Sequence, residues 1–228
     1  MIVGPVLEEP AGWVWRDSVG DVEVRFTGKG GSSRADHLLS AWGDGAVPSE
    51  ASWCTQIHSA EVLSARPGNA GRGDALHSDH RGLALSVVTA DCVPILLASE
   101  SRLAAIHAGW RGIVQGVVPA GVEALVGRVG GTGLRAWVGP AIGSCCYEVD
   151  EDVAEQVVSA SDSGVLAQGP RGKPHVDLPW AVLWQLREAG VEEIRPVPLC
   201  TRCEVDWLWS YRREGAGAGR NHAVIWRR

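Results

Sequence analysis

The chain has 228 residues, which is enough for one large domain with a substantial core or for two small domains. Its 45% of hydrophobic and 21% of charged residues are ordinary for a soluble globular protein, and no apolar run approaches the roughly 20 residues of a membrane helix. The formal net charge of −6 argues against a protein that binds nucleic acid through bulk electrostatics.

The start of the chain predicts no secretory signal. Residues 1–10 lack a basic region and carry Glu8 and Glu9, so we expect neither a signal peptide nor a membrane partner. We expect a cytoplasmic protein, a monomer or small homo-oligomer, whose six cysteines stay reduced.

The N-terminal part predicts short strands joined by glycine-rich loops. A short strand is expected over residues 12–16, and residues 21–27 alternate polar and apolar side chains as a half-buried strand does. The loop at 28–33 would let backbone amides approach an anion, although no adjacent helix pattern makes it a P-loop.

Residues 53–62 predict a further strand, with Gln56 and His58 on one face. A lone histidine in such a strand is usually a half-buried residue without a special role. The next stretch, residues 66–78, is rich in glycine and carries Asp74, so we expect it to be a loop.

The central part of the chain contains two apolar runs, 83–88 and 93–98, that predict buried strands. Between them Thr89-Ala90-Asp91-Cys92 is a polar break where a buried strand should have none. A third short run, 103–106, ends on His107. Cys92 and His107 therefore both lie at strand ends, where rigid elements hold side chains that face a cleft.

The remaining chain mixes helices and strands without a regular alternation. Pro119 should kink or restart the first helix, and Asp150 and Asp177 are good N-caps for the second and third. No linker divides the sequence, so we predict one α+β domain over residues 1–228. The expected helices span 113–129, 153–160 and 178–189, and the expected strands span 134–138, 193–199 and 222–226.

Three residues of this chain have the side chains of a catalytic zinc site, which takes three protein ligands and leaves a fourth position open. They are His58, Cys92 and His107, and their spacing in sequence is dispersed. Alternatively, Cys92 and His107 form a thiolate–imidazole pair for nucleophilic catalysis, with Asp91 orienting the base. A metal-bound thiolate is a poor free nucleophile, so only one of these interpretations can hold.

Two further groups of residues have the chemistry of binding sites. Cys200 and Cys203 have the spacing of a zinc knuckle or a redox motif, but no second pair at ribbon spacing accompanies them, so we do not expect a structural zinc there. Arg111 lies at the start of a predicted helix, where a guanidinium and unpaired amides favour phosphate, and Arg212 and Arg213 could add to such a site.

Taken together, the motifs of this chain resemble those of the laccase-domain family. This family was once named multicopper polyphenol oxidases and is now regarded as purine nucleoside phosphorylases; bacterial members are also called peptidoglycan editing factors. The motifs that carry the resemblance occur in this order: Thr55-Gln56-Ile57-His58, Thr89-Ala90-Asp91-Cys92-Val93-Pro94, Ile106-His107-Ala108-Gly109-Trp110-Arg111-Gly112, Gly139-Pro140-Ala141-Ile142-Gly143, Tyr147-Glu148-Val149, Cys200-Thr201 and Ser210-Tyr211-Arg212-Arg213.

The resemblance implies a mixed β-sandwich flanked by helices, similar in core to bacterial cysteine-hydrolase toxins. It also implies a mononuclear zinc, held by His58, Cys92 and His107, with copper able to replace it. The implied reaction is the phosphorolysis of inosine, adenosine or methylthioadenosine to base and ribose 1-phosphate, and the family is also credited with adenosine deamination. Asp91 is then expected to accept a proton or to orient the cysteine ligand next to it.

The N-terminal part departs from the family pattern. The family's arginine before a Gly-Gly-Val-Ser segment is missing, and Lys29 in the loop at 28–33 is nearest to its place. The Asn-Leu-Gly signature is not visible in 38–43. Lys29, Arg111 and Arg212 are the candidate phosphate contacts, and purine nucleosides and phosphate are the expected substrates.

Three other functions compete with a phosphorylase. A multicopper phenol oxidase needs many histidine ligands, whereas this chain has seven histidines and a single methionine. A cysteine-dependent hydrolase that edits peptidoglycan precursors would use Cys92 and His107 without a metal. A partner-binding cell-wall protein with a structural zinc is favoured only if several of the eleven tryptophans form one exposed patch.

Overall fold

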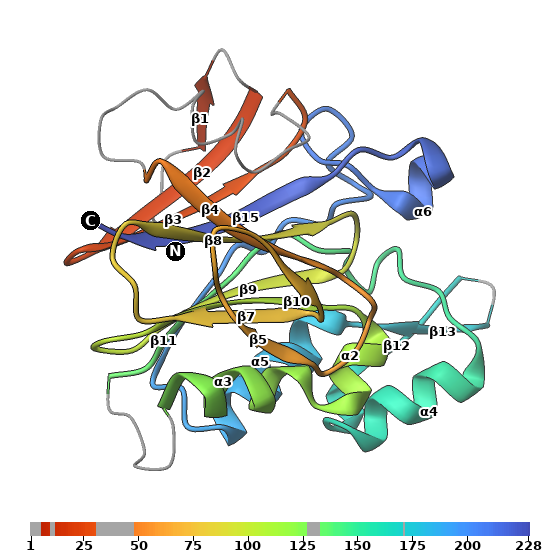
Figure 1. Ribbon diagram of the computed structural model, residues 1–228. Helices are drawn as coiled ribbons and strands as arrows, with labels where there is room; N and C mark the ends of the chain where they lie inside the picture. The colour runs from red at the N-terminus through yellow and green to blue at the C-terminus, as the bar shows by residue number, and fades with distance from the viewer. Residues whose placement is uncertain (1–5, 10–11, 31–47, 127–132, 171) are drawn as a thin grey trace.

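The two apolar runs at the centre of the chain become strands of different sheets. The first forms β8 (Leu83–Thr89) and the second forms β9 (Val93–Ala98). β8 belongs to one sheet and β9 to the other, so the short polar segment between them carries the chain from one layer to the next (Figure 1). The polar break in the sequence is this crossing.

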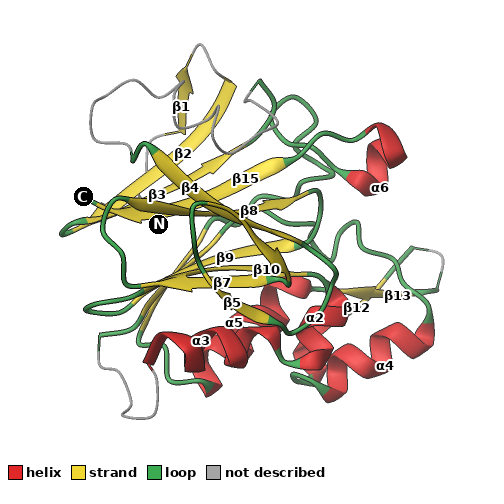
Figure 2. Cartoon of the chain, viewed as in Figure 1, coloured by secondary structure: helices red, strands yellow, loops and turns green. Residues whose placement is uncertain are grey.

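The protein was analysed as a computed structural model, which describes residues 6–9, 12–30, 48–126, 133–170 and 172–228. In these ranges two large β-sheets pack face to face, and helices cover the outer face of the second sheet (Figure 2). This arrangement confirms the predicted α+β class, a mixed β-sandwich with flanking helices.

The first sheet is mixed, and its central position is filled by the strand nearest the C-terminus. β15 pairs antiparallel with both β3 and β8, whereas β4 runs parallel to its neighbours β6 and β8. Within the described residues the strand order is β1 (Val6–Glu9), β2 (Gly12–Val19), β3 (Val22–Thr27), β15 (Asn221–Arg227), β8, β4 (Glu50–Thr55) and β6 (Gly68–Arg72).

The second sheet lies between the first sheet and the helices. β10 pairs antiparallel with β9 and β7, and the two edges are closed by parallel pairs. Its order in the described chain is β14 (Glu193–Pro196), β11 (Arg135–Val138), β9, β10 (Leu103–Ala108), β7 (Ala75–Ser78) and β5 (Val62–Ser64). A small hairpin-like pair, β12 (Leu166–Gln168) and β13 (Pro174–Val176), lies apart from both sheets.

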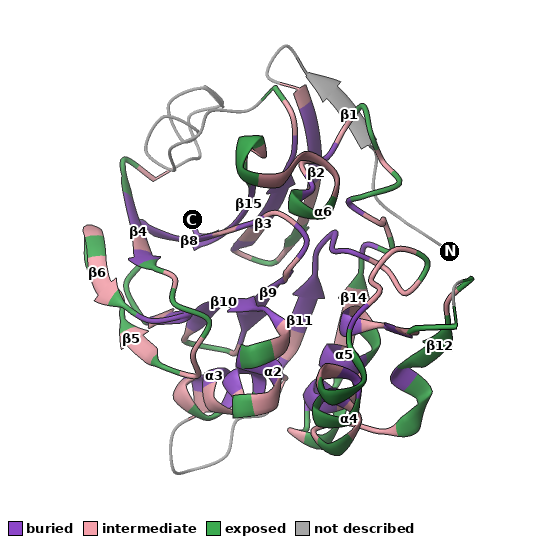
Figure 3. Cartoon of the chain, turned by 90° about the vertical axis from the view of Figure 1, so that its right-hand side faces the viewer, coloured by how far each residue is buried: buried purple, intermediate pink, exposed green. Residues whose placement is uncertain are grey.

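Side chains that point alternately to the two faces of the strands form the two larger apolar cores of the described residues. Leu96 on β9 packs between the sheets with Trp13 and Trp137, while Ile95 and Leu97 face the helices. Burial of each such side chain stabilises the fold by about 1.5–3 kcal/mol. Figure 3 shows the buried residues concentrated between these layers, with exposed residues on the outer sides of the helices.

The predicted helix over 113–129 is two helices, α2 (Trp110–Gln115) and α3 (Val117–Val126). The break lies at Gly116, whose φ of 85° ends α2 in the left-handed conformation that glycine adopts without strain. Pro119 is the third residue of α3, where its missing N–H has no intrahelical partner to lose. The restart predicted for this segment is therefore present.

The other two predicted helices are confirmed as α4 (Glu151–Ser159) and α5 (Leu178–Glu188). The carboxylate of Asp177 caps α5 by accepting a hydrogen bond from the N–H of Trp180 at 2.9 Å. Asp150 stands at the N-cap of α4 but makes no capping hydrogen bond; its carboxylate lies 3.2 Å from Nζ of Lys173 instead. A further short helix, α6 (Tyr211–Glu214), lies near the end of the first sheet (Figure 1).

Two of the sequence predictions are wrong. The strand expected over 53–62 ends at Thr55, and His58 lies in the following loop. The loop expected over 66–78 contains β6 and β7, because short strands with little hydrophobic content gave no alternating signal.

Parts of some predictions lie outside the described residues: the second half of the loop at 28–33, the departure from the family signature at 38–43, and residues 127–129 of the expected helix. In the described ranges, we find no helix whose length and apolar character would let it cross a membrane.

Candidate active site

His58, Cys92 and His107 come together at one end of the sandwich. His58 follows β4, Cys92 lies between β8 and β9, and His107 lies within β10. Their ligand atoms all lie within 4.8 Å of one another, and Cys92 Sγ is 3.9 Å from Nε2 of His58. The two imidazole rings meet edge to face with centroids 4.9 Å apart. Three residues that are dispersed in sequence thus form one cluster, which we call the His/Cys cluster.

A buried carboxylate, Asp74, organises this cluster. It lies immediately before β7, and its oxygens accept hydrogen bonds from the backbone N–H groups of Ile57, His58 and Ser59 at 2.6–3.2 Å. The hydroxyl of Ser59 donates a further one at 2.7 Å. Three successive amides that point at one carboxylate cannot belong to a strand, so this contact explains why the chain leaves the sheet before His58.

Asp74 also contacts His107 directly. Nδ1 of His107 lies 2.8 Å from Oδ1 of Asp74, and both side chains are buried. This hydrogen bond places the proton on Nδ1 and leaves Nε2 with its lone pair toward the cluster. The sequence predicts Asp91 as the residue that orients this histidine, but in the structure Asp74 holds that position. The available signal was a lone acidic residue directly before an apolar pair in a glycine-rich stretch.

The cluster has unusual acid–base properties. Burial raises the pKa of the Cys92 thiol, but hydrogen bonds and positive charge from His107 and His58 outweigh it and lower the pKa to about 6. Burial would lower the pKa of His107, yet the hydrogen bonds and negative charges of Asp74 and Cys92 raise it to about 9. Without a metal, the two groups therefore form a thiolate–imidazolium pair at neutral pH.

Gly109 closes the cluster on the side of α2. A Cβ atom at this position would lie 2.8 Å from Cδ2 of His58 and 3.0 Å from Sγ of Cys92. Since carbon–carbon contacts are favourable only near 3.5–4.0 Å, a side chain here would displace the ligands. Glycine is required because the backbone itself forms the floor of the site.

The carboxylate of Asp91, next to Cys92, joins the cluster to the C-terminal segment. Its Oδ1 accepts a hydrogen bond from the hydroxyl of Thr201, and its Oδ2 accepts one from the N–H of Arg212, each at 2.6 Å. Asp91 has a φ of 97°, which costs a non-glycine residue energy. These bonds hold the strained residue in place and fix the position of Arg212 beside the cluster.

Two arginines place positive charge near Tyr147, a residue next to the cluster. The Arg212 guanidinium lies 5.1 Å over the Tyr147 ring and donates a hydrogen bond to the carbonyl of Glu148 at 2.8 Å. Burial raises the pKa of Tyr147 to about 12, together with the charges of Cys92 and Asp91 and against those of Arg212 and Arg111. Arg111 is exposed, stacks over Trp110 at 4.4 Å, and makes no ion pair with any described residue. Both arginines thus act electrostatically on the same ring.

Lys29 lies beside α6, the short helix that also carries Arg212. Its ammonium forms an ion pair with Glu214 at 2.9 Å, donates a hydrogen bond to the carbonyl of Val205 and lies 4.8 Å over the ring of Trp209. The positive charge is therefore already paired, and no contact joins Lys29 to Arg111 or Arg212 among the described residues. Of the three candidate phosphate contacts, Arg212 lies over the ring of Tyr147, and the charge of Arg111 also acts on that ring.

Comparison with known proteins places this chain among a set of close relatives. A family model described as multi-copper polyphenol oxidoreductase laccase matches residues 35–228. A purine nucleoside phosphorylase of Streptomyces coelicolor is 39% identical over 204 residues, which cover 86% of this chain and 83% of that protein. Purine nucleoside phosphorylase YfiH of Escherichia coli is 33% identical over 187 residues, covering 80% and 76%. The crystal structure of a Neisseria meningitidis protein aligns with a TM-score of 0.77 and 28% identity, covering 92% and 96%.

Proposed function

This chain belongs to the multi-copper polyphenol oxidoreductase laccase family, and from that membership we propose that it is a metal-dependent purine nucleoside phosphorylase. It would cleave inosine, adenosine or methylthioadenosine with inorganic phosphate. A phosphate oxygen forms the new bond to C1′ of the ribose, the bond from C1′ to the purine nitrogen breaks, and the purine takes up a proton. The names of the relatives support this reaction class. The observation that carries the proposal is the His/Cys cluster held by Asp74.

The cluster fits a divalent zinc ion. Two imidazoles and a thiolate are borderline-soft donors of the kind that zinc and copper accept, and three protein ligands leave a position open for a substrate. The carboxylate–histidine contact between Asp74 and His107 is the arrangement that supports metal-binding histidines. The low pKa of Cys92 provides the thiolate form that a metal requires. We propose His58, Cys92 and His107 as ligands of zinc, which copper can replace.

A metal bound here would supply positive charge to orient an anionic or polar group of the substrate. Residues of the chain would bind and orient the phosphate. Arg111 and Arg212 provide two guanidinium groups for phosphate, and the hydrogen bond that the N–H of Arg212 donates to Asp91 fixes the backbone of Arg212. Tyr147 lies beneath Arg212 as a flat support, and its raised pKa keeps the phenol neutral.

Asp91 is proposed as a positioning residue in this reaction. Both oxygens of its carboxylate already accept a hydrogen bond, so the arrangement supports an orienting role better than proton transfer. The strained backbone at Asp91 sets the direction of the Cys92 side chain.

The competing functions need other features. Multicopper oxidation requires several clustered copper sites rich in histidine, whereas the described residues contain one group with two histidines and another with cysteines alone. A cysteine hydrolase would use the thiolate–imidazolium pair of the metal-free cluster, with Asp74 in the orienting role. That mechanism predicts activity in protein without metal and is tested by the same assay.

The decisive experiment measures purine release from inosine and adenosine in the presence and absence of phosphate, with metal analysis of the same preparation. The proposal expects phosphate-dependent release, accumulation of ribose 1-phosphate, and loss of activity on chelation. Free ribose without phosphate would indicate a nucleosidase, and inosine formed from adenosine would indicate a deaminase. Full activity in metal-free protein would contradict the proposed role of the His/Cys cluster as a metal site.

A further inference from the structure

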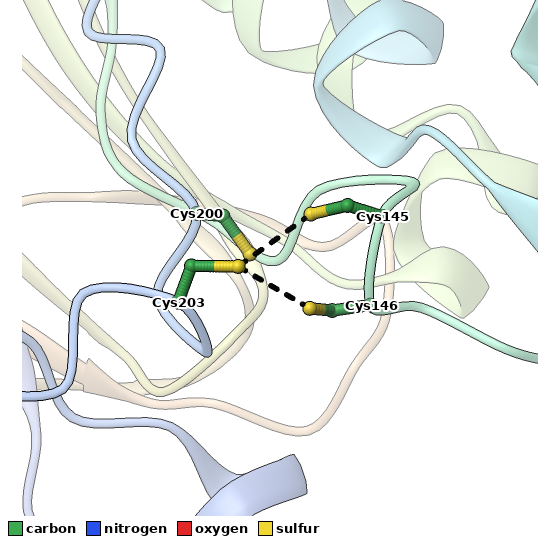
Figure 4. A group of neighbouring side chains, drawn as sticks. All are labelled: Cys145, Cys146, Cys200 and Cys203. Carbon is green, nitrogen blue, oxygen red and sulfur yellow. Dashed lines mark hydrogen bonds between the residues drawn. The ribbon is translucent and has the colours of Figure 1, made fainter.

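A second group of potential ligands lies outside the catalytic site. Within the described residues four thiols approach one another closely, and their side chains point toward a common centre (Figure 4). We call this group the four-cysteine cluster; its members are Cys145, Cys146, Cys200 and Cys203. One pair comes from the turn before Tyr147 and the other from the turn that follows β14.

The sulfur positions match the geometry of a tetrahedral metal site. All four sulfurs lie within 4.8 Å of one another, and Cys203 is 3.8 Å from Cys145 and 3.5 Å from Cys146. Four sulfurs at the Zn–S distance of about 2.3 Å from one ion are about 3.8 Å apart at the edges of the tetrahedron. We propose that the four-cysteine cluster is a structural zinc site in which four thiolates hold a single ion.

This site is not predicted from the sequence, because Cys145 and Cys146 are adjacent and do not have the spacing of a ribbon pair. The backbone conformation nevertheless brings the cysteine side chains together. The N–H of Cys146 donates to the carbonyl of Gly143 at 2.9 Å, and this tight turn directs both side chains to one side. On the other arm, the N–H of Cys203 donates to the carbonyl of Cys200 at 3.1 Å, which closes the Cys-x-x-Cys turn.

The surroundings suit a site with excess negative charge. One zinc ion and four thiolates carry a net charge of −2, which needs donors and cations nearby. The N–H of Gly143 donates to Sγ of Cys200 at 3.3 Å, and the guanidinium of Arg202 lies 3.5 Å from Sγ of Cys146. Arg202 is exposed and its guanidinium makes no ion pair with a carboxylate in the described chain, so its charge is available to the cluster.

The ion would join the two segments that carry one wall of the active site. Cys146 is followed by Tyr147, and Thr201, which binds Asp91, lies between the two cysteines of the other turn. The same segments already pair through the N–H of Thr201 and the carbonyl of Ala141 at 3.0 Å. The site therefore acts at a distance from substrate, as a cross-link that sets the position of Tyr147 and Arg212. This inference is independent of the proposed phosphorolysis.

Metal content of variants separates the two sites. In protein purified under reducing conditions we expect two zinc ions per chain, falling to one in Cys203→Ser and also to one in Cys92→Ala. Cys54→Ala removes a cysteine that belongs to neither cluster and should retain both ions. X-ray absorption of the zinc in Cys92→Ala should show sulfur neighbours only, at about 2.3 Å.

The measurements on Cys92→Ala remain valid if Cys203→Ser fails to fold, because Cys92→Ala leaves the four-cysteine cluster intact. After cobalt replaces zinc in Cys92→Ala, an intense sulfur-to-metal charge-transfer band should appear and should be absent from apo protein. A metal-free Cys92→Ala preparation, nitrogen or oxygen neighbours in its zinc shell, iron in place of zinc, or a disulfide within the cluster would each overturn the assignment.

Discussion

Nδ1 of His107 and Oδ1 of Asp74 lie 2.8 Å apart in a part of the molecule from which water is excluded. The same carboxylate accepts three backbone N–H groups from the loop that carries His58. Burial raises the pKa of Asp74, but the hydrogen bonds from His107 and Ser59 outweigh it and hold the pKa well below its usual range. A single ionised side chain therefore positions two of the three proposed metal ligands.

Replacing Asp74 by Asn should test this role. The amide has the same size but offers one acceptor fewer and no charge, so the imidazole of His107 loses the partner that fixes its tautomer. We expect metal affinity to fall by about 10–100-fold, as is typical for partners of metal-binding histidines. Titration with a competing chelator measures the change. Asp79→Asn, an exposed change on the same segment, is the control and should bind metal normally.

Gly109→Ala should damage the site without changing any ligand. The added methyl group would lie 2.8 Å from the His58 ring and 3.0 Å from the Cys92 sulfur, so the ligands must move apart. We expect loss of stoichiometric metal and of activity, with the circular dichroism spectrum preserved. Gly217→Ala adds a methyl group where no atom lies within 4 Å and serves as the control. Full metal occupancy in Gly109→Ala would show that the floor of the site is not as close as described.

Arg111→Ala should weaken phosphate binding specifically. Loss of one charge-assisted contact costs about 1.5–3 kcal/mol, which corresponds to about a tenfold to hundredfold rise in the KM for phosphate. Metal content should not change, because arginine is not a ligand. Steady-state kinetics with phosphate and nucleoside varied separately measure the effect, and Arg187→Ala on the exposed side of α5 is the control. An effect confined to the nucleoside KM would reassign Arg111.

The pH profile of activity in Asp91→Asn distinguishes a positioning role of Asp91 from a role as proton acceptor. The substitution keeps an oxygen for the Thr201 hydroxyl but places an amide N–H₂ against the N–H of Arg212. A positioning residue predicts a raised KM for phosphate and a pH profile of the same shape as the wild type. Disappearance of one limb of the profile would identify Asp91 as a proton acceptor instead.

Alkylation of the metal-free protein should reveal the acidity of Cys92. Only the thiolate reacts, so the rate should rise with pH through about 6 and remain constant above that value. Burial and the charge of Asp74 raise the pKa of Cys54 to about 12, and this thiol should stay unmodified at neutral pH. Mass spectrometry of digested samples locates the label, and zinc added beforehand should protect Cys92. Modification of Cys92 that increases only above pH 8 would contradict the ion pair with His107.

Motifs in the sequence were sufficient to identify the three residues of the His/Cys cluster, because each lies in a distinctive short segment. Asp74 could not be found this way, since its role depends on the curled backbone at His58, which appears only once β4 and β7 are in place. The strands around the cluster were predictable from their apolar runs. Their assignment to two sheets was not, because hydrophobic content does not tell which neighbour a buried strand will choose.

The four-cysteine cluster could not be predicted from the sequence either. Its two halves are separated by more than fifty residues, and one half consists of adjacent cysteines that match no spaced ligand motif. The packing of β11 against β14 and the bridge between Ala141 and Cys200 bring the two turns together. The phosphate contact expected of Lys29 stays a prediction, and the sequence could not show that its ammonium pairs with Glu214, 185 positions further along.

The central position of β15 in the first sheet has a consequence for how the protein is made. While β15 is still inside the ribosome, β3 and β8 have no strand between them, and the sheet exists only as two unconnected halves. Its formation depends on contacts that span most of the chain, which makes folding slow and leaves unpaired strand edges exposed during synthesis. The loops at Asp91 and Arg212, which β8 and β15 help to position, can meet only after β15 is inserted between β3 and β8. The candidate active site is therefore completed only once β15 has joined the sheet.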